Sequence, residues 1–438
     1  MGKLVDDPTA TIDDAYWSVN GFQPLPAPVA SAVKIEVGFD LASNGIGDFF
    51  TLSDPAKGAL DSTSFVLAGD VLYDLTGLTR EVTVRRGRSR TLEKFTAGLA
   101  QVVMDNRVRL LDPSNTDSPF TGSIVPRKQV SISRDGKPIY TGNVEGWSWD
   151  YDLSGDATAE VRVVDGFASL AQADMTAGTA PGTTPGARIG TALTYAGWPT
   201  AARALATGNA TLDSDVIADG TNVLQYIQKV EQSEPGAFFM SRDGIATFLS
   251  RADLQNPTSG NVTFGSGGVP VVEFAAASLT DEMKNAVAVT YTAGSVVGGT
   301  ATATDATSAA AYGQFDYSLD TVLSGNLQAQ RLADWLVASY KDPKYRIDSI
   351  TVLLDSLTTM QQGQVLDLEL GDVVTVAMSL PNINAVGTAV SQLLSIDAIE
   401  HQISVDRHFV TFTMSETTTG FVLDSATFGV LNTSKLGF

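Results

Sequence analysis

Apolar and polar residues alternate along much of the chain, as they do in strands that bury one face. The first such run is Val33-Lys34-Ile35-Glu36-Val37, and Val82 and Val84 open a longer series of alternating segments. Successive side chains of a strand point to opposite faces of a sheet, so each run predicts a half-buried β-strand. The pattern therefore predicts a chain that is mainly β.

Several of these runs come in pairs that are separated by tight-turn residues. Glycine supplies the positive φ that a short hairpin turn needs, so each such pair predicts an antiparallel hairpin. The turns are expected at Asp135-Gly136, Ser154-Gly155 and Asp243-Gly244, and a last hairpin is expected between residues 399–405 and 409–414.

Three segments have helical spacing instead. Val223, Ile227 and Val230 recur at steps of four and three, and residues 187–196 and 327–340 have similar periodicity.

Two further segments are assigned to a strand and to a loop. Residues 365–370 are expected to form a strand of the last barrel, and the Gly/Ala/Thr-rich residues 291–310 are expected to form a long exposed loop.

The order of these elements predicts a mainly β fold with an α+β insert, in which two antiparallel β-barrel-like domains flank a small α+β domain. The expected divisions are an N-terminal extended arm (1–30), a first β-barrel domain (31–170), a small α+β domain (171–269), a second β-barrel domain with a packed helix (270–416) and a C-terminal clip (417–438).

A short motif recurs near the two ends of the chain. Its apolar positions keep identical offsets in the two copies, which are Phe50, Leu52 and Leu60 in the first and Phe421, Leu423 and Leu431 in the second. Chance matching of common residues is one interpretation, because short matches are weak evidence for a repeat. The other is that both segments are clips that fill similar grooves on neighbouring subunits.

The composition narrows the classes of function. The formal net charge is −21, and a surface this acidic repels phosphate, which argues against general nucleic-acid binding. The absence of cysteine excludes disulfides, thiolate catalysis and Cys-ligated zinc.

Sequence motifs of catalysis are also absent. The chain has no HExxH, GxSxG, Walker or complete GxGxxG motif. The histidines, His401 and His408, flank the turn of the last hairpin, where a metal site with Glu400 or Asp406 competes with a role as surface or interface residues. We predict no catalytic residue, no cofactor and no metal site. A glycosidase-type pair among the 49 acids stays open.

The sharpest local anomaly is basic. Arg80, Arg85, Arg86, Arg88 and Arg90 fall within eleven residues of an otherwise acidic chain. No aromatic residue for base stacking lies among them, which disfavours nucleic-acid binding. A guanidinium group holds two carboxylate oxygens at once, inside the fold or across a subunit interface. Of these alternatives, we expect a subunit interface that involves Arg85, Arg86, Arg88 and Arg90.

These arginines belong to a longer stretch that resembles a known family. The residues run from Val82 through Val102-Val103-Met104-Asp105-Asn106, Arg109 and Asp112-Pro113 to Pro126-Arg127 and Tyr140-Thr141-Gly142. Over about residues 80–150, this order is similar to the first barrel of minor tail proteins from phages of actinobacteria and of siphophage baseplate hub proteins. Residues 285–290, 370–373 and the closing hairpin follow the order of the second barrel of the hub proteins.

The resemblance implies a function without catalysis. It implies a homotrimeric structural component of a phage tail tip that joins the tail tube to the tip and lines or closes the DNA channel. The expected partners are a distal tail ring protein, a tape measure protein and tip or fibre proteins, with DNA only as passing cargo and no membrane anchor. The expected location is the tail tip of the virion, after synthesis in the host cytoplasm.

Three alternatives stay open beside this reading. The first is the distal tail ring protein of the same tail, and the second is a tail-associated cell-wall hydrolase. The third is a carbohydrate-binding module that would use aromatic residues, namely Tyr16, Trp17, Trp147, Trp149 and Trp198.

Overall fold

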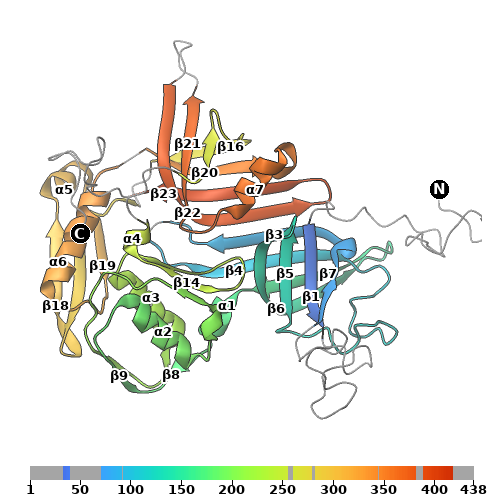
Figure 1. The fold of residues 1–438 in the computed structure, drawn as a ribbon, viewed down its shortest axis with the longest axis horizontal. Helices are drawn as coiled ribbons and strands as arrows, with labels where there is room; N and C mark the ends of the chain where they lie inside the picture. Colours follow the sequence, from blue (N-terminus) through green and yellow to red (C-terminus); the bar gives the residue numbers. More distant parts are fainter. Residues whose placement is uncertain are drawn as a thin grey trace, which may run out of the picture.

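The computed structural model describes residues 33–39, 71–90, 92–254, 260–278, 282–343, 345–380 and 388–417. Within these ranges the chain is mainly β with an α+β insert, as the sequence pattern predicts. In Figure 1 the blue and teal strands of the N-terminal part lie beside the orange and red strands of the C-terminal part. The green helices lie below them, and the yellow-orange unit with α6 lies at the far end.

Thirteen strands of the described residues form one large sheet, in the order β16-β20-β23-β22-β3-β4-β7-β6-β5-β1-β2, and β21 pairs with β22 and with β15. The first lobe contributes β1 (Val33–Phe39), β2 (Val71–Asp74), β3 (Thr79–Gly87), β4 (Thr96–Asp105), β5 (Gln129–Arg134), β6 (Lys137–Tyr151) and β7 (Ala157–Val164). The second lobe contributes β15 (Thr263–Gly265), β16 (Glu273–Ala277), β20 (Arg346–Leu353), β21 (Val373–Leu380), β22 (Thr388–Ser404) and β23 (His408–Glu416).

The core of the first lobe is formed by side chains at alternate positions of its strands. Val82, Val84 and Val102 are fully buried, and so are Val161 and Val163 on the neighbouring β7. Burying a valine side chain contributes roughly 1.5–3 kcal/mol, so this face supplies much of the stability of the lobe. The predicted hairpins at Asp135-Gly136 and Ser154-Gly155 join β5 to β6 and β6 to β7 and are confirmed.

The lobes meet through direct strand pairing. β22 lies antiparallel to β3, with Ile403 opposite Val82 and Glu400 opposite Arg85. The pairing joins residues more than three hundred positions apart, so the two lobes share one continuous sheet. We call this β3–β22 junction, with the side chains that cross it, the seam.

The α+β insert lies between the lobes in sequence. Its helices are α1 (Gly166–Leu170), α2 (Pro185–Tyr195), α3 (Val223–Ser233) and α4 (Arg251–Leu254), and two of them, α2 and α3, were predicted and are confirmed. Its strands are β8 (Asp174–Met175), β9 (Gly178–Ala180), β10 (Arg203–Leu205), β11 (Asp215–Ile217), β12 (Thr221–Asn222), β13 (Ala237–Met240) and β14 (Ala246–Leu249). The hairpin turn at Asp243-Gly244 joins β13 to β14, as predicted.

A separate three-stranded unit follows. β17 (Ala286–Ala293) pairs with β18 (Val296–Thr304) and with β19 (Asp316–Leu319), and α5 (Ala306–Tyr312) precedes β19. The predicted helix is confirmed as α6 (Asn326–Tyr340). It packs on β17 and β18 rather than on the large sheet. The loop prediction for residues 291–310 is wrong, because its threonines and valines favour a pleated strand and complete a hairpin.

The strand prediction for residues 365–370 is also wrong. Helix α7 (Thr359–Asp367) covers its first part, and Thr358 and Gln361 form a capping box at the N-terminus of the helix. The two reciprocal hydrogen bonds of the box satisfy backbone groups that a helix start leaves unpaired. In the described parts, none of the helices has the length and apolar character that crossing a membrane requires.

Candidate assembly site

The basic cluster lies at the seam and not on an outer rim. Strand β3 is flanked by β4 on one side and β22 on the other, so it is an interior strand of the large sheet. Arg86 points to the second lobe, where its Nη1 lies 2.6 Å from Glu369 Oε1, and only 3% of its surface is exposed. Arg88 forms an ion pair of 2.7 Å with Asp397 and stacks on the ring of Phe95 at 4.6 Å.

Two more ion pairs join the lobes. Arg134 on β5 pairs with Asp355 at 2.7 Å, and Lys137 on β6 pairs with Asp367 at 2.6 Å. In all four pairs the cation comes from the first lobe and the carboxylate from the second. Buried charges are tolerated when they are paired and hydrogen-bonded, so the seam is held by matched charges as well as by strand pairing.

The described contacts of the cluster lie within one chain. Arg86 and Arg88 pair with Glu369 and Asp397 of the second lobe, beside the pairing of β3 with β22. Arg80 likewise pairs with Asp105 and Asp156 of its own lobe. The subunit-interface role of Arg85, Arg86, Arg88 and Arg90 stays a prediction, and of these Arg85 and Arg90 are exposed.

The two lobes lie close together at Gly87. Its φ is +115°, and a Cβ atom built there would lie 2.2 Å from the carbonyl oxygen of Asp397. The next residue, Arg88, donates its backbone N–H to that same oxygen at 2.9 Å. Only glycine combines this backbone conformation with this contact, which explains why it stands between the two seam arginines.

The two histidines lie inside the seam. His401 Nδ1 and His408 Nε2 are 3.0 Å apart, and both residues are buried. The expectation that they are surface or interface residues is therefore wrong, because β20 and β3 flank the hairpin of β22 and β23. Among the described residues, no three His, Cys, Asp or Glu side chains gather in a way that could hold a metal ion.

Hydrogen bonding assigns the protons of this pair. Arg134 Nη1 lies 2.9 Å from His408 Nδ1, and a guanidinium group can only donate, so His408 Nδ1 accepts. A neutral His408 then donates from Nε2 to His401 Nδ1. Burial lowers the pKa of His408 to about 3, and burial with the neighbouring His408 holds the pKa of His401 well below its usual value. Both rings are neutral at pH 7.

Asp355 connects this pair to the backbone. Its Oδ1 accepts from Arg134, and its Oδ2 accepts the backbone N–H of His408 at 2.7 Å. The side chains of Asp355, Arg134, His408 and His401 are therefore linked in a row by hydrogen bonds. Arg134 belongs to the first lobe and the other three to the second. These directional hydrogen bonds favour one arrangement of the two lobes over others.

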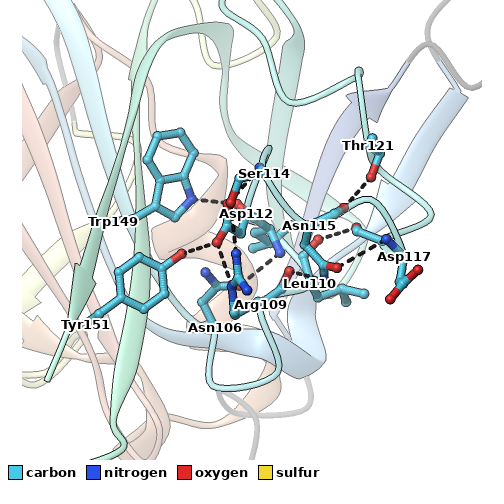
Figure 2. Close-up of polar contacts among 12 residues, drawn as sticks. Asn106, Arg109, Leu110, Asp112, Ser114, Asn115, Asp117, Thr121, Trp149 and Tyr151 are labelled. Carbon is cyan, nitrogen blue, oxygen red and sulfur yellow. Dashed lines mark hydrogen bonds and ion pairs between the residues drawn. The ribbon is translucent and has the colours of Figure 1, made fainter. Parts of the chain in front are cut away.

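A loop at the far end of the first lobe is held by polar contacts instead of regular structure (Figure 2). Asp112 accepts hydrogen bonds from Ser114 and Tyr151 and pairs with Arg109 at 2.8 Å. These contacts hold the pKa of Asp112 well below its usual range. Trp149 donates its indole N–H to the carbonyl oxygen of Leu111, so strand β6 anchors the loop.

The same end of the lobe exposes apolar side chains. Val108 on this loop is 70% exposed, and Leu153 at the turn between β6 and β7 is fully exposed. The contacts of Asp112 and Trp149 fix the loop that carries Val108, and Leu153 lies in the turn between β6 and β7. Rigid exposed apolar groups are a feature of interaction sites, and we treat this end of the first lobe as a candidate assembly surface.

The remaining candidates are placed as follows. The clip residues Phe50, Leu52, Leu60, Phe421, Leu423 and Leu431 lie outside the described residues, as do Tyr16 and Trp17. Trp149 and Trp198 donate their indole N–H groups to backbone carbonyl oxygens and pack against the core. Their rings therefore do not form an open surface on which a sugar could stack.

Sequence reasoning missed the acidic half of the seam. Glu369 accepts from Arg86 with one oxygen and from the backbone N–H of Arg242 with the other. A signal was present, since Glu369 stands between Leu368 and Leu370 in an apolar segment, where a lone charge indicates a buried partner. Nothing in the sequence says that this partner lies 283 positions away.

The fold is similar to that of solved phage tail proteins. The 43 kDa tail protein of prophage MuSo2 from Shewanella oneidensis matches with a TM-score of 0.52 and 12% identity, over 89% of this chain and 97% of that one. A tail protein from Neisseria meningitidis MC58 matches with a TM-score of 0.53 and 12% identity, over 88% and 96%. No family model and no curated protein matches the sequence. The chain thus has the fold of these tail proteins, as the sequence resemblance implies.

Proposed function

We propose that the chain is a non-enzymatic structural subunit of a phage tail, a hub or minor tail protein that joins the tail tube to the tip. The observation that carries the proposal is the fold shared with two tail proteins, one of them from a prophage, over nearly the whole length of each chain. Fold alone does not fix function, so the proposal also draws on the residues of the first lobe that resemble this family.

The proposed assembly is a homotrimer. Two sheet-bearing lobes in each chain would place six around the axis, so one face could meet a six-fold tail ring while the other stays three-fold. A distal tail ring protein, a tape measure protein and tip or fibre proteins are the proposed neighbours. The exposed Val108 and Leu153 support the end of the first lobe as one contact surface.

The acidic composition supports a role around passing DNA. With a net charge of −21, carboxylates that face a central channel would repel phosphate and keep DNA from adhering. We propose that the assembled ring lines or closes the DNA channel at the virion tail tip. A neutral or basic axial surface in the assembled particle would contradict this part of the proposal.

Particle mass and rotational symmetry test the proposal. We expect three-fold particles of the purified chain, alone or with its tail neighbours, in mass photometry and in averaged electron micrographs. A six-fold ring would identify the distal ring protein instead. A chain that stays monomeric with its neighbours supplied, and that gives a lysis band on cell wall lost on substitution of one acid, would identify a wall hydrolase.

A matched pair of variants locates the contact surface. Val108→Asp with Leu153→Asp places charges on the candidate surface, and we expect it to lower the assembled fraction without changing the fold. Met360→Asp is the control, because Met360 is 77% exposed on α7 in the second lobe. Equal assembly of both variants would place the contact elsewhere.

A further inference from the structure

A cavity lies where the insert, the three-stranded unit and the large sheet meet. It has a volume of about 110 Å³. Its walls come from α3, from β19 and α6, from the middle of β22 and from the end of β23. Tyr317, Trp335 and Tyr340 form an aromatic side of this cavity. Engineered protein cavities of roughly 150 Å³ accept benzene, so this one has room for a short alkyl chain.

One carboxylate oxygen in the wall has no partner. Glu231 is 5% exposed, and its Oε1 accepts the backbone N–H of Phe238 at 3.0 Å. Its Oε2 is buried and has no hydrogen-bond partner among the described residues. Native proteins rarely leave a buried carboxylate oxygen unpaired, so its position in a cavity wall indicates a donor that occupies the cavity.

The charges around the cavity favour a cation as this donor. Arg88 is neutralised by Asp397 at 2.7 Å, and Lys94 is an exposed residue at the rim of the cavity. Glu231 is then the charge left without a close partner. Aromatic faces attract ammonium groups, so Trp335 suits the same ligand. Tyr317 and Tyr340 add apolar contact, because Lys284 and Arg346 of the same chain already lie over their rings at 5.8 and 5.7 Å.

We propose that this cavity binds a primary alkylammonium group, whose N–H donates to Glu231 Oε2 while its alkyl chain lies against the aromatic side. The group could belong to a free amine or to a lysine side chain of another subunit. The proposal stands apart from the tail role, since binding to the isolated chain does not require assembly.

Calorimetric titration with n-butylammonium chloride at pH 8.5 tests the proposal, with n-butanol as the neutral control. We expect saturable binding of the ammonium, and about tenfold weaker binding or none by Glu231→Gln, which keeps the shape of the side chain and loses its charge. Equal binding by both proteins, no binding by the wild type, or equal binding of butanol would overturn the proposal.

A second variant covers the case in which Glu231→Gln fails to fold. Trp335→Phe keeps an apolar ring but weakens the attraction for a cation, so we expect severalfold weaker binding of butylammonium and unchanged binding of butanol. Equal losses for both ligands would indicate an apolar cavity without a cation site and would overturn the proposal.

The pH dependence gives an independent measure. Burial raises the pKa of Glu231 to about 7, so butylammonium should bind more tightly at pH 8.5 than at pH 6. Burial also raises the pKa of Tyr317, and that of Tyr340 to about 12, so neither ring ionises in this range. The other charged groups around the cavity are Arg88, Glu93, Lys94 and Glu416. Equal affinity at the two pH values would overturn the role of Glu231.

The source of the ammonium group is distinguished by its effect on assembly. If a lysine of another subunit fills the cavity, butylammonium competes with it and lowers the assembled fraction in mass photometry, while tetramethylammonium, which has no N–H, does not. If the natural ligand is a free amine, butylammonium binds and assembly is unchanged.

Discussion

Separate parts of the chain meet at both the seam and the cavity. The two places differ in whether their buried charged groups have a partner of opposite charge. At the seam, Arg86 and Arg134 each have a carboxylate partner within 2.7 Å. In the cavity, Glu231 has one oxygen without a partner among the described residues. At the seam the opposite charge comes from the same chain, and in the cavity we propose that a ligand supplies it. Buried charges therefore show which contact a chain makes by itself and which it leaves to another molecule.

The largest expected effect comes from Gly87→Ala. The new Cβ would meet the carbonyl oxygen of Asp397 at 2.2 Å, so β3 and β22 would have to separate. We expect the free energy of unfolding, measured by urea denaturation, to fall by about 4 kcal/mol or more, at the upper end of single substitutions. Gly136→Ala is the control, because Gly136 also has positive φ but nothing lies within 4 Å. It should cost only about 1–2 kcal/mol.

Arg86→Ala should have the next largest effect. It removes the cation from a buried pair and leaves Glu369 without its charged partner, which costs about 3–5 kcal/mol in comparable pairs, and we expect the lower end because Glu369 is partly exposed. Arg85→Ala, on the exposed neighbour, should change stability by less than about 0.5 kcal/mol. Equal losses in the two variants would show that the pair at Glu369 is not what stabilises the seam.

Acidification should weaken the seam through the histidines. The pKa of His408 is about 3 in the folded chain and about 6.5 when unfolded, so the unfolded chain binds more protons between these values. Stability is full above pH 6.5 and falls as the pH decreases, by about 2 kcal/mol at pH 5. His408→Asn keeps an acceptor for Arg134 and cannot titrate, so its stability should fall less. An equal loss of stability at acid pH in the wild type and in His408→Asn would contradict the role given to protonation of His408.

The smallest expected effect is that of Glu231→Gln without ligand. The raised pKa of Glu231 means that the folded chain holds this proton up to about pH 7, while the unfolded chain releases it near pH 4.5. The wild type therefore loses stability as the pH rises from about 4.5 to 7, and the Gln variant does not. We expect the variant to gain about 1 kcal/mol on the wild type between pH 5 and pH 6. No change with pH would indicate that Glu231 is solvated.

Local patterns predicted much of the fold. Asp-Gly turns located the hairpins at residues 135–136 and 243–244, and apolar spacing located α2, α3 and α6. The failures have local causes too. Helix α7 was taken for a strand because Val365, Leu366, Leu368 and Leu370 fit a short apolar run, whereas the capping box at Thr358 favours a helix.

The sites were harder to predict because they depend on distant pairing. The sequence marked the arginine cluster as unusual but could not choose between a carboxylate of the same chain and one of another subunit. Glu231 did leave a signal. It lies eight residues after Val223 and falls on the apolar stripe of α3, a position where a charged residue is unusual. That signal points to a buried carboxylate without naming its partner.

A double-mutant cycle on Arg86 and Glu369 tests most directly the claim that the arginine cluster joins the two lobes within one chain. The free energy of unfolding would be measured for Arg86→Ala, Glu369→Ala, both together and the wild type, at several protein concentrations. We predict a coupling energy of about 2 kcal/mol that does not change with concentration. A coupling near zero, or one that grows with protein concentration, would contradict the claim and return these arginines to an interface between subunits.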